Sequence, residues 1–515
     1  FVRVQGDDLL LDPWEIAASF VVTVLVCLLA AAQPARQAML VPPREALVIH
    51  EGGARKQNPH KRITIVGMVL ILLVWPVSQL PAILEIPLPG YLATFLLFLG
   101  FSLLSPWCLQ VVGTYSAPKL RRLFGESAHL GGRYVRDAGT RAAISVGALI
   151  TAVALFVGLV IMVHSFRNTV KVWVEESISG DLFLRPKMAG VNRYRDPLPR
   201  GMPAALEKLK TPVTLMPYRR IFLHYGKNLY QFETIDFQIF MQHARFLFMD
   251  GDAEKILPDL AMGRGVVISE VFAYQSGMEV GGRFQAQIQS VRLDLPVLGI
   301  FRDYRTQGGA VYYSMPRFQE LTGDMSWSGV RIFLSEQSGD REASTERLRT
   351  EILDVLGDEV HAIEITTGKE LHGAIMQIFD ETFAVTSVLL MIALLVATLG
   401  IATTLTVLVL ERTRQLHTLI AVGASFRQIR TMVFWEAILM VFTGEAIGLG
   451  CGFFLSALLV FVINRQSFGW TFIYGTDWVS ISLSLPLILL TALVAAIPAV
   501  QTLFKRPPAQ VLKER

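Results

Sequence analysis

Residues 411–430 read ERTRQLHTLIAVGASFRQIR and join two long apolar runs of the chain, at about 383–410 and 431–463. Each run exceeds the roughly 18 apolar residues that are needed to cross a bilayer core of about 30 Å. The polar stretch between the two runs is therefore predicted to lie at a membrane surface, where it connects two transmembrane helices.

The polar stretch has the pattern of a short amphipathic helix. Leu416, Leu419 and Ile420 recur at helical spacing and predict one apolar face. Gly423 suits the end of this helix, because glycine readily takes the left-handed conformation of a C-cap, and Arg427 would begin a second helical segment. A basic loop that only anchors lipid headgroups is the alternative interpretation.

The chain as a whole is apolar, since 52% of its 515 residues are hydrophobic and 17% are charged. This composition predicts an integral membrane protein. Because backbone amides inside a bilayer must be paired within their own segment, the apolar runs are predicted to be helices. We expect seven transmembrane helices, at about 14–32, 63–80, 91–113, 142–163, 383–410, 431–463 and 479–504.

Basic residues are concentrated in the loops on one side of these helices, and the positive-inside rule assigns that side to the cytoplasm. They lie between the first two helices, before the fourth, after the fifth and in the C-terminal tail. The net charge of +4 is thus a topology signal, and no nucleic acid is expected as a partner. The rule predicts a cytoplasmic C-terminus and places Phe1 outside.

The long insert between the fourth and fifth helices is predicted to be a folded extracytoplasmic domain. Strand patterns occur near 284–289, 295–300 and 330–334, and helical patterns near 204–209, 341–356 and 367–379. The predicted fold class is therefore an α-helical polytopic membrane protein with a large α+β domain inserted between two transmembrane helices.

A short motif occurs after the first and again after the last predicted helix. PARQ at 34–37 is followed by PPREAL at 42–47, and PAVQ at 498–501 is followed by PPAQVL at 507–512. The match predicts two copies of one membrane unit, with chance prolines at helix exits as the alternative. Since the chain begins at Phe1 without an initiator Met, we expect it to be the C-terminal part of a longer protein.

The segment at 411–430 resembles the signature R-x-R-E-[LI]-x-x-L-[RK]-A-x-G-A-x-x-x-Q-I of FtsX-like ABC transporter permeases of the MacB type. The matching positions are Arg412, Arg414, Leu416, Leu419, Ala421, Gly423, Ala424, Gln428 and Ile429. Gln415 stands where the family usually has Glu, and Ile420 where it has Arg or Lys. The resemblance implies a coupling helix that docks into a groove of a dimeric cytoplasmic ABC ATPase.

A second stretch, GVVISEVFAYQSGMEVGG at 265–282 with LPVLGIF at 295–301, resembles the periplasmic core domain of the same family. Local chemistry alone predicts a strand, a helix and a hairpin here. Ser269 suits the N-cap of that helix and Gly277 suits its end.

The resemblance also implies a domain plan, that of a ten-helix permease with two FtsX-like units whose N-terminal part is missing here. The expected parts are the last helix and basic tail of a first unit at 1–50, a linker with two helices at 51–120, an amphipathic segment and the first helix of a second unit at 121–164, an extracytoplasmic MacB-like domain at 165–380, and an FtsX-like permease domain with three helices at 381–515.

Motifs of catalysis and ATP binding are absent from the sequence. There is no G-x-x-x-x-G-K-[ST] loop, and TGK at 367–369 is only a fragment of one. H-E-x-x-H, G-x-S-x-G and paired-cysteine motifs are also missing. We therefore expect no catalytic residue, cofactor or metal in this chain, with ATP and Mg²⁺ bound by the partner ATPase.

Two acidic residues and three glycines stand out within the predicted span at 431–463. A charge at the bilayer centre costs roughly 2.5 kcal/mol or more, so Glu436 and Glu445 are expected to face protein. Glu436 is expected to pair with Arg427 or Arg430, whereas a functional and a structural role both stay open for Glu445. The spacing of the glycines predicts a smooth stripe that lets another helix approach closely. They are Gly444, Gly448 and Gly452.

Together with the resemblance, these features predict a permease subunit in the bacterial inner membrane. The helices at 142–163 and 383–410 would transmit motion from the ATPase to the outer domain. Because the spans hold few polar side chains, we expect no hydrophilic pore, and the expected cargo is a lipid, a lipoprotein or another hydrophobic compound. Membrane lipids and a periplasmic or adaptor protein are further expected partners.

Two other function classes compete with the transporter. One is an FtsX-type regulator or sensor that controls extracytoplasmic partners without moving a substrate. The other is an intramembrane enzyme, which the sequence disfavours because no nucleophile stands with a base.

Overall fold

The computed structural model describes residues 13–40, 59–83, 86–137, 139–177, 179–251, 253–304, 308–335, 340–411, 413–483 and parts of 485–494. Its contacts divide the chain into two units, Phe1–Pro59 and His60–Arg515. The described part of the first unit is one helix, α1 (Pro13–Leu40), which covers the first predicted transmembrane run. The elements below lie in the second unit, apart from Pro59, the first residue of helix α3.

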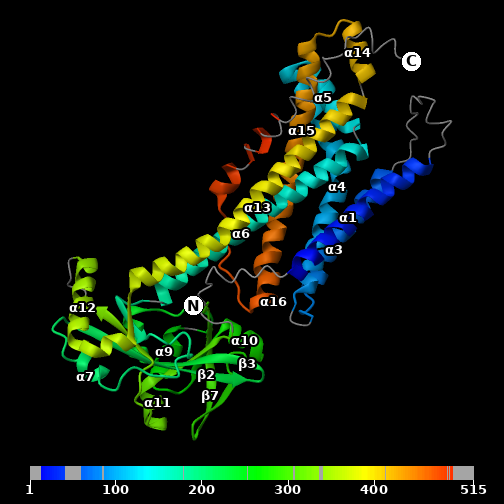
Figure 1. The fold of residues 1–515 in the computed structure, drawn as a ribbon. Coiled ribbons are helices and arrows are strands. Elements are labelled where there is room, and N and C mark those ends of the chain that lie inside the picture. The colour runs from blue at the N-terminus through cyan, green and yellow to red at the C-terminus, as the bar shows by residue number, and fades with distance from the viewer. Residues whose placement is uncertain are drawn as a thin grey trace. The chain divides into compact units, whose positions relative to one another are not determined.

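The second unit contains a helical bundle (Figure 1). Its helices are α3 (Pro59–Ser78), α4 (Leu88–Phe124), α5 (Glu126–Asp137), α6 (Gly139–Ser177), α13 (Gly368–Glu411), α14 (Thr413–Ala421), α15 (Phe426–Ala457), the π-helical stretch η3 (Leu458–Ile463) and α16 (Asn464–Phe468). Four described segments are long and apolar enough to cross a membrane, namely Lys61–Ser78, Leu88–Phe124, Ala142–Glu176 and Phe426–Phe468.

These four segments coincide with the second, third, fourth and sixth predicted transmembrane helices. The spans expected at 14–32, 383–410 and 479–504 stay predictions, so the expected number of seven is not confirmed. α1 and α13 are long helices over the first two of these ranges, and residues 495–504 lie outside the described residues.

The structure corrects one boundary of the sequence analysis. We predicted a helix at 367–379 in the inserted domain and a separate transmembrane helix from 383 onward, but α13 runs through both as one helix of 44 residues. The physical reason is that neither proline nor glycine occurs between Gly373 and Gly400 to interrupt it. At 1.5 Å per residue, α13 is about 66 Å long.

The glycine stripe of α15 lies directly against α6. A Cβ built on each glycine would come too close to an aliphatic side chain of α6: Gly444 to Leu149 at 2.5 Å, Gly448 to Val153 at 2.7 Å and Gly452 to Val157 at 2.7 Å. Both sets recur every four residues, so a ridge of α6 fills a groove of α15. The stripe therefore brings two helices of this unit together.

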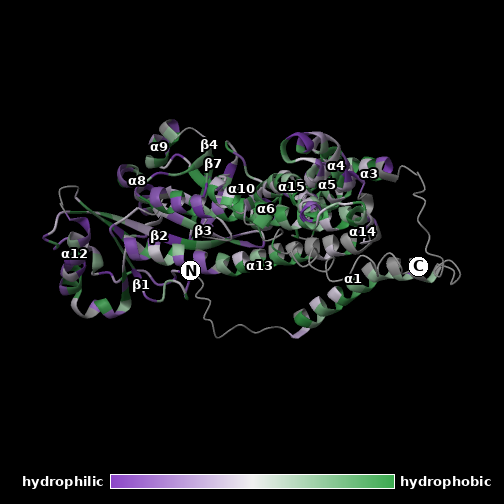
Figure 2. Cartoon of the chain, turned by 90° about the horizontal axis from the view of Figure 1, so that it is seen from above, coloured by the Kyte–Doolittle hydropathy of each residue, from purple (hydrophilic) through white to green (hydrophobic). Residues whose placement is uncertain are grey.

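A domain of strands and short helices, residues 179–367, is inserted between α6 and α13 and is called the sheet domain below. Its strands are β1 (Leu182–Pro186), β2 (Val213–Tyr225), β3 (Asn228–Ile235), β4 (Phe248–Asp250), β5 (Val266–Ser269), β6 (Arg283–Ile288), β7 (Val291–Phe301), β8 (Ala310–Ser314), β9 (Gly329–Leu334) and β10 (Ile363–Thr367). Its helices are α7 (Met202–Leu206), α8 (Phe237–His243), α9 (Ala253–Ala261), α10 (Glu270–Ser276), α11 (Met315–Thr322), α12 (Arg341–Leu356) and the 3₁₀ helix η2 (Gly357–Ala362). Figure 2 shows that hydrophilic residues are frequent in this domain, whereas the bundle helices are mostly hydrophobic.

The strands form one mixed sheet in the order β10-β1-β9-β2-β3-β8-β5-β7-β4, with β6 paired to β7. Neighbours are antiparallel except for the parallel pairs β3–β8 and β5–β7. β1 follows α6 and β10 precedes α13, and the two strands pair from Leu182↔Thr367 to Pro186↔Ile363. Both chain connections to the bundle therefore lie side by side at one edge of the sheet.

The sheet is covered on both faces, and the sequence of β5 shows why. Val267 joins a core with α8 and α9, whereas Val266 and Ile268 join another core with α10 and α11. A continuous apolar strand is typical of such two-sided burial. A third core, which includes Leu348 and Ile352 of α12, packs against β1 and β9 near the connecting edge.

Local patterns in this domain were largely predictable. Ser269 caps α10 by accepting a hydrogen bond from the Phe272 amide, and Gly277 ends that helix in the left-handed conformation, as predicted. The strands expected near 284–289, 295–300 and 330–334 are β6, the C-terminal part of β7 and β9. The helix expected at 341–356 is α12, whereas the one expected at 204–209 begins earlier as α7.

A buried charge cluster connects three neighbouring strands. Glu233 on β3 has no exposed surface. Its Oε2 accepts hydrogen bonds from Arg220 Nε at 2.9 Å and from Gln231 Nε2 at 2.6 Å, and Arg331 on β9 lies 3.6 Å from its Oε1. The Tyr194 ring covers the Arg220 guanidinium at 4.4 Å. The negative charge of the Glu233 carboxylate thus stabilises the positive charges of two buried guanidinium groups.

Replacing a glycine of the stripe is expected to separate α6 from α15. Gly448→Ala should lower stability by about 1–3 kcal/mol because its methyl group would overlap Val153. Gly450→Ala is the matched control, since a Cβ there meets nothing within 4 Å. Thermal unfolding of both variants in detergent checks this, and equal unfolding midpoints would contradict it.

Removing the charge of Glu233 is expected to destabilise the sheet domain. Glu233→Gln keeps the shape of the side chain but leaves Arg220 and Arg331 without their counter-charge, which should cost about 3–5 kcal/mol. Urea unfolding of the full chain in detergent, followed by hydrogen exchange in β2 and β3, measures the loss. The exposed Glu207→Gln is the control, and a similar small effect of both substitutions would refute the argument.

Candidate functional site

The predicted amphipathic helix exists as α14, which follows α13 at the end farthest along that helix from the sheet domain (Figure 1). Gly423 has φ +109° and its amide donates to the Ile420 carbonyl at 3.0 Å. The Ala424 amide donates to the Leu419 carbonyl at 2.9 Å. These two bonds form a Schellman motif, so the predicted helix end at Gly423 is confirmed.

The next helix begins with a capping box that the sequence analysis missed. The Ser425 amide donates to Gln428 Oε1 at 2.8 Å, and the Gln428 amide donates to Ser425 Oγ at 3.3 Å. The pattern S-x-x-Q at 425–428 was the available signal. Gln428 thus positions the turn between α14 and α15, which local hydrogen bonds hold from both sides.

The inner face of α14 packs on α15 and α5. Leu416 is 2% exposed and forms a small core with Ile429, Met432 and Val433 of α15. Leu419 and Ile420 are partly buried against the same core, as their spacing predicted. Side chains of α5 also contact this core. They are Leu130 and Tyr134.

The outer face of the turn presents apolar side chains. Val422 is 83% exposed and Phe426 is 53% exposed, and both lie between Ala421 and Arg427, which are also exposed. Of the other predicted site residues, Gln415, Gly423 and Gln428 are exposed and Ala424 is half-buried. Arg412 and the side chain of Arg414 lie outside the described residues.

Both acidic residues of α15 are buried. Glu436 is 3% exposed, and its predicted ion pair with Arg427 or Arg430 stays a prediction. Glu445 is 7% exposed, and its Oε1 has no hydrogen-bond partner among the residues that the structure describes. Both carboxyl groups therefore face protein, which agrees with the cost of exposing such groups to lipid.

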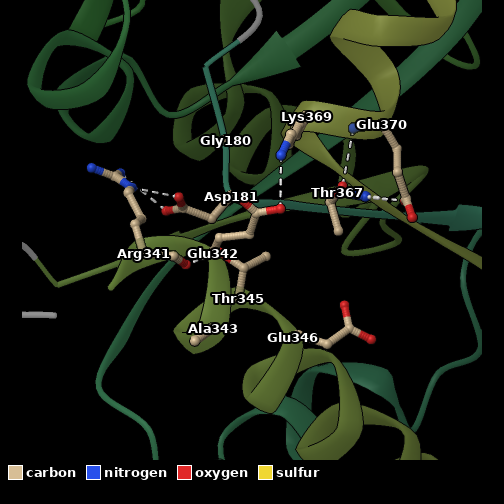
Figure 3. A pocket seen from close by; sticks show the side chains of 11 residues that line it. Gly180, Asp181, Arg341, Glu342, Ala343, Thr345, Glu346, Thr367, Lys369 and Glu370 are labelled. Atoms are coloured by element: carbon tan, nitrogen blue, oxygen red, sulfur yellow. Dashed lines mark hydrogen bonds and ion pairs between the residues drawn. The ribbon is translucent and has the colours of Figure 1, made fainter. Parts of the chain in front are cut away.

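An open pocket of about 650 Å³ lies where the two chain connections enter the sheet domain (Figure 3). Its lining residues come from the approach to β1, from α12, from the end of β10 and from the start of α13: Gly180, Asp181, Arg341, Glu342, Ala343, Thr345, Glu346, Thr367, Gly368, Lys369 and Glu370. Arg341 Nε lies 2.7 Å from Asp181 Oδ1, and Lys369 Nζ lies 2.7 Å from Glu342 Oε1. These ion pairs attach α12 to both connections.

The TGK fragment at 367–369 begins α13. The Thr367 amide donates to Glu370 Oε2 at 2.9 Å, and the Glu370 amide donates to Thr367 Oγ1 at 3.1 Å. The Thr367 amide lowers the pKa of Glu370 because it stabilises the carboxylate. The fragment is thus part of a capping box, and its T-x-x-E spacing was readable from sequence.

The two connections touch each other at their glycines. The Gly368 amide donates to the Asp181 carbonyl at 3.0 Å, and a Cβ on Gly368 would overlap the Gly180 carbonyl oxygen. Neither position leaves room for a side chain. The chain therefore enters and leaves the sheet domain through one narrow crossing.

The described residues contain no group of three or more His, Cys, Asp or Glu side chains that could hold a metal ion. The two cationic side chains of the pocket already have carboxylate partners. The site thus consists of a hydrogen-bonded turn with an exposed apolar tip. It follows closely on α13, which runs from Gly368 at the sheet domain to Glu411.

Comparison with known proteins identifies part of the chain directly. Residues 387–508 match the model of the FtsX-like permease C-terminal family. The chain is also 25% identical over 464 residues to an uncharacterized ABC transporter permease protein of Mycobacterium tuberculosis. This alignment covers 88% of the chain and 52% of the relative, so the chain spans about half the length of the curated relative that it matches.

Two solved structures are similar to a part of the chain. The periplasmic region of MacB from Actinobacillus actinomycetemcomitans is 14% identical, with a TM-score of 0.27, 39% of this chain covered and 97% of that one. The extracellular domain of the noncanonic ABC-type transporter YknZ from Gram-positive bacteria is 17% identical, with a TM-score of 0.25, 37% of this chain covered and 100% of that one. Residues 387–508 therefore form an FtsX-like permease C-terminal domain.

Proposed function

We propose that the chain is the membrane subunit of an ABC transporter and that the turn between α14 and α15 receives the movement of a separate cytoplasmic ATPase dimer. The observation that carries this proposal is the length of α13, which runs as one helix from the sheet domain at Gly368 to Glu411, two residues before α14 begins. A displacement of α14 would therefore move the base of the sheet domain as well.

The exposed surface of the turn between α14 and α15 favours binding to an apolar surface of a partner protein. Val422 and Phe426 are exposed at its tip, while Leu416 and His417 are buried beneath it. Large apolar side chains exposed on a rigid, locally hydrogen-bonded turn are typical of a docking site. The inner core transmits a force on this tip to α15 and α5.

The finer features of the proposal follow the domain plan given above. In this proposal the chain has seven transmembrane spans in the bacterial inner membrane and a cytoplasmic C-terminus. Residues 165–380 form an extracytoplasmic domain, and residues 381–515 form a permease domain. The ATPase subunit binds ATP and Mg²⁺, and the permease chain has no enzymatic activity of its own. The cargo class is a lipid, a lipoprotein or another hydrophobic compound, since the four described spanning segments are mostly apolar.

The test is a charge placed on the exposed tip. Val422→Asp should weaken co-purification of the ATPase about tenfold or more, because a carboxylate would have to be buried in an apolar contact. Phe426→Asp should act in the same way. Coupled ATP hydrolysis and export should fall together.

The matched control is Val191→Asp, since Val191 is 78% exposed but lies in the sheet domain. It should leave ATPase binding unchanged. If Val422→Asp and Phe426→Asp both retain the ATPase and its coupled activity, the proposed docking site is wrong.

A further inference from the structure

The segment after α16, residues 469–475, is hydrogen-bonded to α6. The Ile473 amide donates to Thr169 Oγ1 at 2.8 Å, and the Gly475 amide donates to Ser165 Oγ at 3.0 Å. Thr169 and Ser165 are fully buried on α6. On the other side, Asn464 Nδ2 of α16 donates to the carbonyl of residue 470 at 2.7 Å. The segment therefore has a defined place on the bundle.

The sheet domain holds the same segment through one threonine. The Thr471 amide donates to Glu270 Oε2 at 3.1 Å, and Thr471 Oγ1 donates to Glu270 Oε1 at 2.9 Å. Tyr304 Oη donates to the Thr471 carbonyl at 2.9 Å. The amide, the hydroxyl and the carbonyl of Thr471 are thus all bonded to the sheet domain, although Glu270 lies 201 positions away in the chain.

Aromatic rings extend this contact on either side of Thr471. The Phe472 ring lies 4.9 Å from Phe166 of α6, and the Trp470 ring lies 5.0 Å from Tyr304 of the sheet domain. Phe472 is 3% exposed. The segment therefore packs toward the bundle with one ring and toward the sheet domain with the other.

The partner carboxylate is costly to leave unpaired. Glu270 is 7% exposed, and burial raises its pKa above the ordinary value although the amide and hydroxyl of Thr471 act against this shift. The Arg302 and Arg465 guanidinium groups also favour its charged form. A buried carboxylate that loses both of its donors must find others or be hydrated. Separation of the contact therefore has to expose Glu270 to water.

Two side-chain donors near this contact have no hydrogen-bond acceptor among the described residues. Trp470 Nε1 and Arg302 Nε are buried and have no hydrogen-bond partner among the described residues. Because these two donors make no hydrogen bond to a described residue, fewer bonds between protein groups must be broken to open the contact.

We propose that residues 470–473 form a releasable dock for the sheet domain, with Thr471 as its positioning residue and Glu270 and Tyr304 as its receptor. This inference rests on the proposed function, because release of the dock is the step by which ATP-driven movement frees the sheet domain from the bundle. The dock is a non-covalent contact in addition to the two chain connections at Gly180 and Gly368.

Hydrogen exchange of the full chain in detergent tests the dock without any transport assay. Thr471→Val removes only the hydroxyl donor and should accelerate amide exchange in residues 470–475 about tenfold or more, because the lost bond is to a charged group. Thr471→Ser should restore slow exchange, and Thr476→Val is the control in the same loop. Size-exclusion profiles verify that each variant is folded.

A double-mutant cycle makes the test specific. Glu270→Ala and Thr471→Val should accelerate exchange less than multiplicatively when combined, since both remove the hydrogen bond between the Thr471 hydroxyl and the Glu270 carboxylate. Unchanged exchange in Thr471→Val, or multiplicative effects in the double variant, would overturn the dock.

The release step is measured on the complex with the co-purified ATPase. Exchange at 470–475 should rise when ATP is bound, and equal protection with and without ATP would overturn release. The Val422→Asp variant separates the two proposals. If it keeps full coupling while Thr471→Val loosens the segment, the proposed ATPase docking site fails and the static contact stands.

Discussion

The close approach of α6 and α15 is the constraint on which the rest of the bundle depends. Three glycines of α15 receive aliphatic side chains of α6 at distances that no other residue would allow. α15 begins at the turn with α14, and its continuation through η3 and α16 leads to the segment at 469–475. The spacing of two helices therefore sets the positions of both the exposed tip and the contact with the sheet domain.

Features that depend on neighbouring residues could be predicted from the sequence. The helix end at Gly423, the N-cap at Ser269 and the strand β9 are local, and the structure has them where they were expected, although β9 is buried on both faces and does not alternate. Two capping boxes, at 367–370 and 425–428, were equally local but were not recognised. The break expected between the inserted domain and the next span was wrong, because the change from polar to apolar composition does not interrupt a helix.

Contacts between distant segments could not be predicted in the same way. Nothing near Glu270 in the sequence indicates that its carboxylate meets Thr471, and nothing in β3 indicates that Glu233 faces two arginines. Such pairs arise from the order of the strands and the packing of the helices. The spacing of residues along a single sequence does not reveal either of them. The glycine stripe could be predicted only in part. Its spacing predicts that another helix packs closely against it, but the spacing does not identify that helix as α6.

The crossing of the two connections at Gly180 and Gly368 has a consequence for the freedom of the sheet domain. This crossing is a joint of the backbone. It sets the position of the sheet domain relative to α6 and α13, but by itself it does not set the orientation of the domain. The hydrogen bond from the Gly368 amide to Asp181 fixes where this joint lies and not which way the domain faces. Only a contact remote from the joint can remove those rotational degrees of freedom.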